Sequence, residues 1–511
     1  MTSMTKIPPQ ACARFFSLAA VGLALLTGAC PGASPGDIRE ASGAYQATGI
    51  KISEPTASSV SVWTRVTRRA DRIADDGPLP VLHVYDRTSG QELAIKDNAR
   101  FVNGRPVVTF AAGSDLGSLR GAAPGTTGQT RVRYRAAGSN TWRETAWQEA
   151  SPERDFTAVF GLSGLPASTR FQVAVEARIN SRAAVSSTVD GGFVTAPAPA
   201  ADAGIKFCVM TCQQYEDRDQ VDGFNIYPAM LRWQPDFFVN TGDAVYYDHG
   251  PVHALNVDLA RYHWARMFGF PTLRDFHRQV GSYFMKDDHD TLTDDCHPGD
   301  RTGDFTFADG LRVYREQTAQ GDPPYRTIRW GRHLQVWLLE GRETRSSRAA
   351  DRTNPPVLLG PEQVRWLSRT LAASDATFRI VITPTPMVGP DRDAKFDNLS
   401  NRGYAVEGNQ VREFLAHQKN LTVITGDRHW QYVSQDQAHL IQEWSVGPAS
   451  DAHAQGWDED QPRPDHLFLR IKHGGFLSGE VKTNATQPSL TLQLHDVNGG
   501  VVFEKTQPAT R

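Results

Sequence analysis

The pattern of hydrophobic and polar positions changes character near residue 200. Before that point, apolar and polar residues alternate with a period of two in short segments, namely SVSVWTRV (59–66), TRVRYRAA (130–137), FTAVFGL (156–162), RFQVAVEAR (170–178) and GGFVTA (191–196). Alternation of this kind is typical of half-buried β-strands. We therefore predict an all-β sandwich over residues 42–196, with residues 68–128 as an insertion.

A linker is expected at 197–204, within the small-residue, proline-rich stretch APAPAADAG. After it come continuous apolar runs that end in polar residues: IKFCVMTC, DFFVNTGD, LQVWLLEGRE, FRIVITPTP, LTVITGD and LIQEWSV. Helix-like stretches lie between several of them, among them YPAMLRWQ, LARYHWARMFG and GPEQVRWLSRTLAAS. Buried strands that alternate with helices predict an α/β domain with covered sheet faces, which we place at 205–505.

The first thirty residues have the layout of a secretory signal peptide. Lys6 and Arg14 precede the apolar run FFSLAAVGLALLTGAC, which ends in small residues. We therefore expect export, with the mature protein in the periplasm, secreted or held at the cell envelope. Cys30 directly follows the small residues, so a lipid anchor at Cys30 is the alternative to simple cleavage, and the only membrane contact that we expect.

Charge and cysteine content narrow the function classes. The chain has 54 basic and 57 acidic residues, and this balance gives no electrostatic footprint for nucleic acid. Of five cysteines, only Cys208, Cys212 and Cys296 lie beyond the leader segment, too few for a disulfide scaffold. One disulfide among the three is compatible with this number. Cys208, inside an apolar run, is predicted to be a buried packing residue.

Residues suited to metal binding follow four of the predicted strands: Cys212, Asp243, Asp288 with His289 in KDDHD, and Asp427 with His429 in ITGDRH. Taken singly, each is more often a turn, cap or packing residue. Ligands in α/β sheets, however, bind beyond the carboxyl ends of strands, and clustered carboxylates raise one another's pKa unless a cation lies between them. The joint pattern therefore favours a metal centre.

Five ordered blocks resemble the PhoD-like alkaline phosphatases, a branch of the calcineurin-like metallophosphoesterases: TCQQY, PDFFVNTGDAVYY, KDDHDTLTDDC, RTIRWGRHLQVWLLEGRETRS and ITGDRHWQYVS. The resemblance covers about residues 203–450. It implies a β-sandwich flanked by helices, preceded by an all-β sandwich of the immunoglobulin or fibronectin III kind. The segment LSGLPASTRFQVAV, with Trp63 upstream, is similar to the fibronectin III pattern, although Phe171 stands where such domains usually carry Tyr.

The resemblance also implies site roles. Cys212, Asp243, Tyr246 and His429 would hold Fe³⁺, with Asp243 bridging to a second ion, typically Ca²⁺, held by Asp288 and Asp427. These donor types match the two ions, although Zn, Mn or Mg are alternatives. His289 is where the superfamily keeps the histidine that protonates the leaving group. Asp287 and Asp290 are left without a role.

The sequence departs from the family pattern at three places. Lys286 replaces the usual Trp, Thr293 or Asp294 the usual Asn, and Glu340 the usual Asp. Arg342 and Arg345 still match, and two roles are open for them: holding substrate phosphate through the planar guanidinium, or an ion pair that supports the loop.

We therefore expect an exported, metal-dependent hydrolase of phosphoric mono- or diesters with a dinuclear centre. The alternatives are a phospholipase-like lipid phosphodiesterase and an anchored, non-catalytic binding protein with a degenerate site. No predicted ligand precedes the linker, so we expect the first sandwich to be separable from the chemistry.

Overall fold

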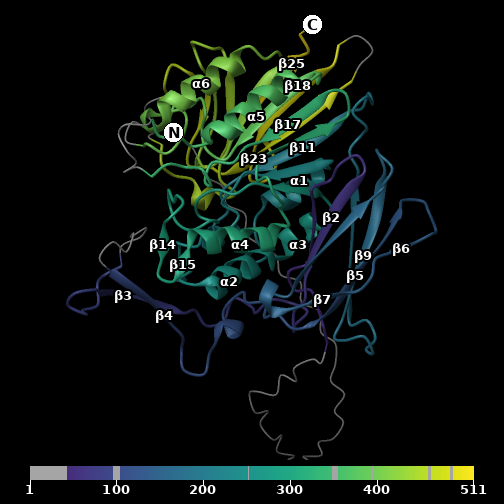
Figure 1. Cartoon of the computed structure of the whole chain (residues 1–511), viewed down its shortest axis with the longest axis vertical. Coiled ribbons are helices and arrows are strands. Elements are labelled where there is room, and N and C mark those ends of the chain that lie inside the picture. Colours follow the sequence, from purple (N-terminus) through teal and green to yellow (C-terminus); the bar gives the residue numbers. More distant parts are fainter. Residues whose placement is uncertain are drawn as a thin grey trace, which may run out of the picture. The chain divides into compact units, whose positions relative to one another are not determined.

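The computed structural model describes residues 43–95, 104–250, 252–347, 355–392, 395–457, 462–483 and 487–510. These residues belong to one compact unit (Figure 1). The signal peptide and the Cys30 anchor fall outside the described residues and stay predictions. Within those residues, the helices are all too short or too polar to cross a bilayer.

The larger sheet has nine strands in the order β25-β24-β23-β11-β12-β13-β1-β2-β8. Its centre is three consecutive parallel strands, β11 (Ile205–Met210), β12 (Phe237–Asn240) and β13 (Gly281–Phe284). Every residue of β12 and β13 is buried, as the continuous apolar runs predict. The outer strands are β23 (Gly475–Lys482), β24 (Ser489–Asp496) and β25 (Val501–Pro508) on one side, and β1 (Ile50–Ser53), β2 (Ser59–Arg65) and β8 (Thr157–Ser163) on the other.

A second sheet has seven strands in the order β16-β17-β18-β19-β21-β20-β22. Strands β17, β18, β19 and β21 run parallel to their neighbours in that part of the order. The strands are β16 (Arg326–Trp330), β17 (Leu334–Leu338), β18 (Phe378–Thr383), β19 (Leu421–Thr425), β20 (Gln431–Gln435), β21 (Gln442–Val446) and β22 (His466–Arg470).

The two sheets pack face to face. One buried apolar cluster joins Val209 and Val239 of the larger sheet to Val336, Ile380 and Ile424 of the smaller one. This is the β-sandwich that the resemblance implied.

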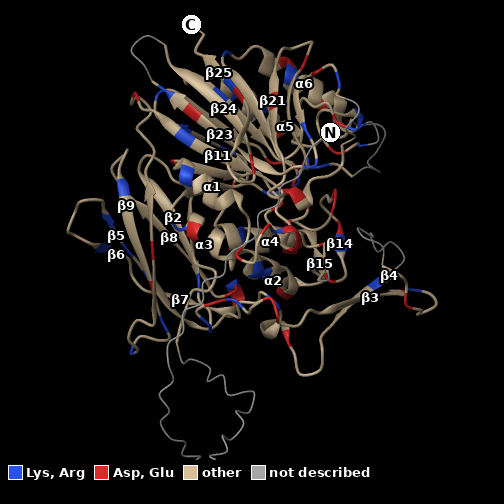
Figure 2. Cartoon of the chain, turned by 180° about the vertical axis from the view of Figure 1, so that it is seen from behind, with Lys and Arg blue, Asp and Glu red and all other residues tan. Residues whose placement is uncertain are grey.

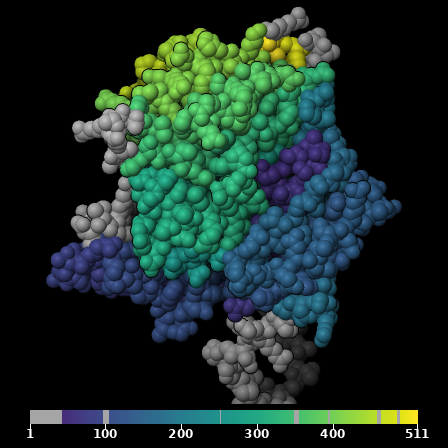
Figure 3. Space-filling view, viewed as in Figure 1, coloured from purple at the N-terminus to yellow at the C-terminus, as the bar shows by residue number. Residues whose placement is uncertain are grey.

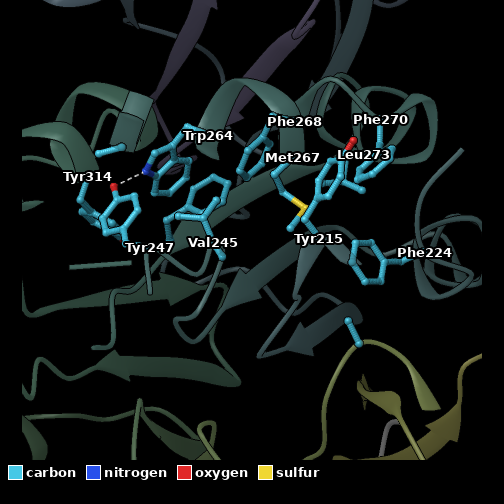
Figure 4. Close-up of a cluster of buried hydrophobic side chains, with 14 of the residues drawn as sticks. Tyr215, Phe224, Val245, Tyr247, Trp264, Met267, Phe268, Phe270, Leu273 and Tyr314 are labelled. Carbon is cyan, nitrogen blue, oxygen red and sulfur yellow. Dashed lines mark hydrogen bonds between the residues drawn. The ribbon is translucent and has the colours of Figure 1, made fainter. Parts of the chain in front are cut away.

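Helices cover both outer faces of this sandwich. On the larger sheet lie α1 (Ile226–Trp233), α2 (Val257–Phe268), α3 (Pro271–His277) and α4 (Phe307–Thr318), the last preceded by the two-stranded pair β14 (Arg301–Thr302) and β15 (Phe305–Thr306). Figure 4 shows the aromatic cluster beneath them, in which the Trp264 Nε1–H donates to the Tyr247 hydroxyl at 2.6 Å. On the smaller sheet lie α5 (Gly360–Ala372) and α6 (Ala405–Ala416).

The predicted N-terminal sandwich is present and all-β. A third sheet, ordered β10-β9-β5-β6 with β7 beside β5, packs on β1, β2 and β8. Its strands are β5 (Gly128–Ala136), β6 (Arg143–Glu144), β7 (Gln148–Ala150), β9 (Arg170–Arg178) and β10 (Ser187–Val194). The predicted insertion holds the antiparallel pair β3 (Val81–Asp86) and β4 (Gly104–Thr109).

The N-terminal sandwich shares strands with the larger sheet of the α/β part, because β1 joins β13 directly. Figure 3 shows these first strands, in purple, wedged between the blue N-terminal part and the green part that follows. The Lys51 ammonium is buried there: it donates to the Gln317 carbonyl at 2.8 Å and lies 3.5 Å from the Trp63 ring centroid. The nine-stranded sheet therefore crosses the position at which the sequence predicts a linker.

Candidate metal centre

The loops after β11, β12, β13 and β19 carry the predicted ligands. Three of these residues, Cys212, Asp243 and Asp427, adopt positive φ angles of 49°, 55° and 61°. Non-glycine residues rarely adopt this left-handed conformation, and it persists only where the surroundings enforce it. Strained backbone at the ends of three strands is typical of a functional site.

Four predicted iron ligands lie together. The Oδ2 atom of Asp243 lies 3.4 Å from Cys212 Sγ and 3.1 Å from the Tyr246 hydroxyl, which in turn lies 3.3 Å from His429 Nε2. The donor atoms of Cys212, Asp243 and His429 are all within 4.8 Å of one another. The structure thus brings these four predicted residues together.

Packing explains how Tyr246 reaches the cluster. Its neighbours Val245 and Tyr247 are buried in the aromatic cluster under α2 (Figure 4). The Tyr246 ring lies instead against His289, with ring centroids 4.3 Å apart.

The chemistry of this donor set fits a cation. Oδ1 of Asp243 is buried without a hydrogen-bond partner. Burial raises the pKa of Asp243 well above its ordinary value, and nearby Asp288 raises it further. Burial and the Asp243 carboxylate likewise raise the pKa of the Cys212 thiol. Such a site is costly unless a positive ion offsets the charge of the ionised groups.

Asp288 and Asp427 lie beside this cluster. Asp243, Asp288 and His289 form a second group whose ligand atoms are within 4.8 Å of one another. Oδ2 of Asp288 accepts from the Asp295 backbone N–H at 2.6 Å. Burial raises the pKa of Asp427 to about 7, although Arg428, whose guanidinium is 3.0 Å away, opposes the shift.

His289 has a buried partner that the sequence analysis missed. Its Nδ1 lies 2.7 Å from Oδ1 of Asp248. Burial alone would lower the pKa of His289, but the carboxylates of Asp248, Asp288 and Asp243 raise it well above the ordinary value. The acid in YYDHG, next to the predicted ligand block, was the available signal for Asp248.

His453 is a second missed residue. Its Nε2 lies 2.9 Å from the Tyr246 hydroxyl, and its Nδ1 lies 2.8 Å from Asp217 Oδ2. The ring centroids of His453 and His429 are 4.1 Å apart. His453 comes from the 3₁₀ turn Asp451–His453, which no sequence motif singled out.

Arg342 and Arg345 lie in buried ion pairs. The Arg342 guanidinium binds Asp287 and lies 3.4 Å from Asp288 Oδ2, while Arg345 donates to Asp295 Oδ1 at 2.9 Å. This is the geometry of the loop-supporting alternative. One terminal nitrogen of each guanidinium is buried without a hydrogen-bond partner.

The two residues left without a role have structural contacts. Asp287 is held by Arg342, and Asp290 accepts the backbone N–H groups of Asp287 at 2.8 Å and Ala244 at 3.1 Å. Asp290 therefore ties the loop after β13 to the loop after β12, and burial raises its pKa to about 7.

Two of the departures from the family pattern meet in space. Lys286 Nζ lies 3.2 Å from Glu340 Oε1 and 2.7 Å from Glu343 Oε1, and the Lys286 and Glu340 side chains are almost fully buried. Glu340 also accepts the Arg342 backbone N–H at 2.6 Å. Lys286 stands where the family usually has an aromatic residue, and the carboxylate of Glu340 beside it pairs with its charge.

The three cysteines and Asp294 are the remaining residues near the site for which the sequence gives a prediction. Cys208, Cys212 and Cys296 are all buried free thiols, so none of these three takes part in a disulfide. Cys208 packs in the cluster beneath the helices, as predicted. Asp294 donates its backbone N–H to Asp248 Oδ2 at 2.8 Å and is in neither of the two ligand groups around Asp243.

Comparison with known proteins shows the family and the fold of the chain. The family model of the PhoD-like phosphatases matches residues 207–462, about half of the chain. A solved structure described as PhoD is 16% identical, with a TM-score of 0.66 over 93% of this chain and 90% of that chain. A purple acid phosphatase from yellow lupin (Lupinus luteus) seeds is 12% identical, with a TM-score of 0.51 over 89% of this chain and 73% of that chain. No curated protein sequence matches. The chain belongs to the PhoD-like phosphatase family and is a hydrolase of phosphoric esters.

Proposed function

We propose that this protein is an exported phosphatase that cleaves phosphoric mono- or diesters at a dinuclear metal centre. Fe³⁺ would be held by Cys212, Asp243, Tyr246 and His429, and Ca²⁺ by Asp288 and Asp427 with Asp243 as the bridge. The observation that carries the proposal is the buried convergence of thiol, carboxylate, phenol and imidazole, with one oxygen of Asp243 left without a partner. The carboxylate and phenolate oxygens match a hard trivalent ion and an oxygen-seeking divalent one, and the thiolate adds a further anionic donor.

When bound, the ions supply the activation of a water molecule and the neutralisation of phosphoryl charge. His289 supplies a proton to the leaving oxygen. Because Asp248 binds Nδ1, the proton for the leaving group is on Nε2. The Asp248 carboxylate raises the pKa of His289, which favours the protonated state that a general acid needs.

Arg342 supports the loop that carries His289. Its guanidinium binds Asp287 and lies beside Asp288, so a buried ion pair holds the loop KDDHD. The buried nitrogens of Arg342 and Arg345 that have no partner are the donors that we assign to substrate phosphate.

Elemental analysis and two substrates test the proposal. Purified protein should contain iron and calcium, and should hydrolyse 4-nitrophenyl phosphate or its bis(4-nitrophenyl) diester with loss of activity on chelation. Zinc or manganese in place of iron would correct the metal assignment. A fully metal-loaded protein inactive on both esters would contradict the proposed function.

The location of the protein, the completeness of its metal ligands and its action on phospholipids distinguish the proposed function from its alternatives. Cell fractionation of the full chain, compared with a Cys30→Ala variant, tells a lipid anchor from simple cleavage. Every predicted ligand is present and buried or half-buried, which is unlike a degenerate binding protein. Release of headgroups from phospholipid vesicles would support the lipid phosphodiesterase instead.

A further inference from the structure

The loop after β18 reaches the metal centre from the smaller sheet. This segment, which we call the rim loop, comprises residues 387–392 and 395–398. Arg428, between the predicted ligands Asp427 and His429, binds Asp391 at 2.7 Å and Asp397 at 3.1 Å. Arg428 also lies 3.0 Å from Asp427. One buried guanidinium therefore joins the rim loop to a predicted ligand.

The base of the rim loop is fixed by a buried acid. Glu443 is fully buried, and its carboxylate accepts the backbone N–H groups of Met387, Val388 and Gly389 at 2.7, 2.8 and 2.8 Å. The side chain of Asn398, at the other end, donates to Asp391 at 2.7 Å. Burial of so many polar groups is favourable only when each finds its partner, so both ends of the loop have a defined position.

Lys395, on the rim loop, lies close to two acids that support the centre. Its Nζ lies 3.3 Å from Asp397 Oδ2 and 3.9 Å from Asp295 Oδ2, the second too far for a hydrogen bond. Asp295 itself donates its backbone N–H to the predicted ligand Asp288. Lys395 thus lies between the residues that support Asp288 and Asp427.

Lys395 differs from the other cations around the centre. The side chains of Arg342, Arg345 and Arg428 are at most 2% exposed and bind carboxylates, whereas that of Lys395 is 28% exposed. Its ammonium has three donors and a single acceptor within hydrogen-bond distance among these two carboxylates. Burial would lower the pKa of Lys395, but Asp397 and Asp295 raise it, which keeps the charge.

We propose that Lys395 is the specificity-determining contact for a terminal phosphoryl oxygen that phosphomonoesters have and diesters lack. The inference rests on the proposed function and names its substrate class: the site prefers monoesters. A monoester dianion carries three terminal oxygens, and a diester monoanion only two. A charged, half-exposed donor beside the centre stabilises the extra oxygen and the extra negative charge.

Two esters with the same leaving group test the proposal on the metal-loaded, full-length enzyme. In Lys395→Met, the ratio of kcat/KM for 4-nitrophenyl phosphate to that for bis(4-nitrophenyl) phosphate should fall about 10- to 100-fold, as for a lost charge-assisted hydrogen bond. The dissociation constant of inorganic phosphate, measured by calorimetry, should rise by a similar factor. Lys395→Arg should keep most of the selectivity. Lys482→Met removes an exposed lysine at the end of β23 and should change neither quantity.

Equal losses on both esters, or an unchanged phosphate affinity, would overturn the proposal. If Lys395→Met loses metal, the same measurements on Lys395→Gln test the substrate contact, because glutamine keeps a hydrogen-bond donor for Asp397. Wild-type selectivity in a metal-loaded Gln variant, or metal loss in both variants, would also contradict a substrate contact. If the wild type cleaves neither ester, the proposed function fails, whereas the phosphate measurement still tests Lys395.

Discussion

The Nδ1 atom of His289 lies 2.7 Å from Oδ1 of Asp248, and both side chains are buried. The other oxygen of Asp248 accepts from the Thr293 hydroxyl at 3.0 Å and the Asp294 backbone N–H at 2.8 Å. The carboxylate therefore has a fixed orientation, and it fixes the imidazole in turn. Figure 2 shows that basic and acidic residues are both spread over the structure.

Asp248→Asn should shift the alkaline limb of the pH–rate profile to lower pH. The Asp248 carboxylate helps to raise the pKa of His289. The stability that this pair gives to the folded protein is therefore present below the unfolded pKa of about 6.5 and is lost as pH rises through the folded pKa. Without this charge the acid deprotonates earlier, by about one pH unit or more. Thr293→Ala keeps the carboxylate and should leave the limb in place. An unmoved limb in Asp248→Asn would show that the pair does not set it.

His289→Ala should retain both metals but slow hydrolysis about 10²- to 10⁴-fold, the usual range for a general acid. The loss should be largest for alkyl phosphates, because nitrophenolate departs without a proton. Elemental analysis with two substrates of different leaving-group pKa checks this. Metal loss with equal collapse on both substrates would make His289 a ligand instead.

Much of the fold could be predicted from the sequence because buried parallel strands are continuous apolar runs. The run FRIVITPTP became β18 and LTVITGD became β19. Strand β1 has only four residues and contains Lys51, so its burial in the larger sheet could not be predicted from its pattern. Its partner β13 lies more than two hundred residues later in the chain, and pairing at that separation leaves no local signal.

Some residues of the candidate site could likewise be predicted from the sequence, and others could not. Cys212, Asp243 and Asp427 directly follow strands, where the topology gathers residues at one edge. Asp248 and His453 reach the site from loop and turn segments, whose course depends on tertiary packing. The contact between Lys286 and Glu340, fifty-four positions apart, is likewise visible only in three dimensions.

Cys212→Ser should lower iron content and change the visible absorption of the protein, because a soft anionic donor is replaced by a neutral hydroxyl. Cys208→Ala is the matched control: this buried thiol lies in β11, four residues before Cys212, but packs among apolar side chains. The control should keep metal and rate. Wild-type colour and activity in Cys212→Ser would make Cys212 a packing residue.

Lys286→Met should destabilise the protein by about 3 kcal/mol, because it leaves Glu340 buried without its cation. Lys286→Met/Glu340→Gln should recover most of that loss, since the neutral amide oxygen can still accept the Arg342 backbone N–H. Urea denaturation of the four proteins of this cycle measures the coupling. Additive costs would show that the two side chains act independently.

Removal of the N-terminal sandwich should abolish folding, although the sequence alone suggests that the sandwich is separable. A chain starting at Ala203 loses Lys51 and Trp63, which donate to the Gln317 and Glu316 carbonyls at the end of α4, each at 2.8 Å. It also exposes the edge of β13, the strand that leads into KDDHD.

A chain starting at Gly43 is the control for this truncation. It lacks only residues before the described part and should be soluble and fully active, because β1 and its buried contacts remain. The shorter chain should be insoluble or unfolded by circular dichroism, since an exposed apolar strand edge favours aggregation. A soluble, metal-loaded chain from Ala203 with measurable turnover would show that β1 is dispensable, and that the buried Lys51 and Trp63 contacts serve only the sandwich.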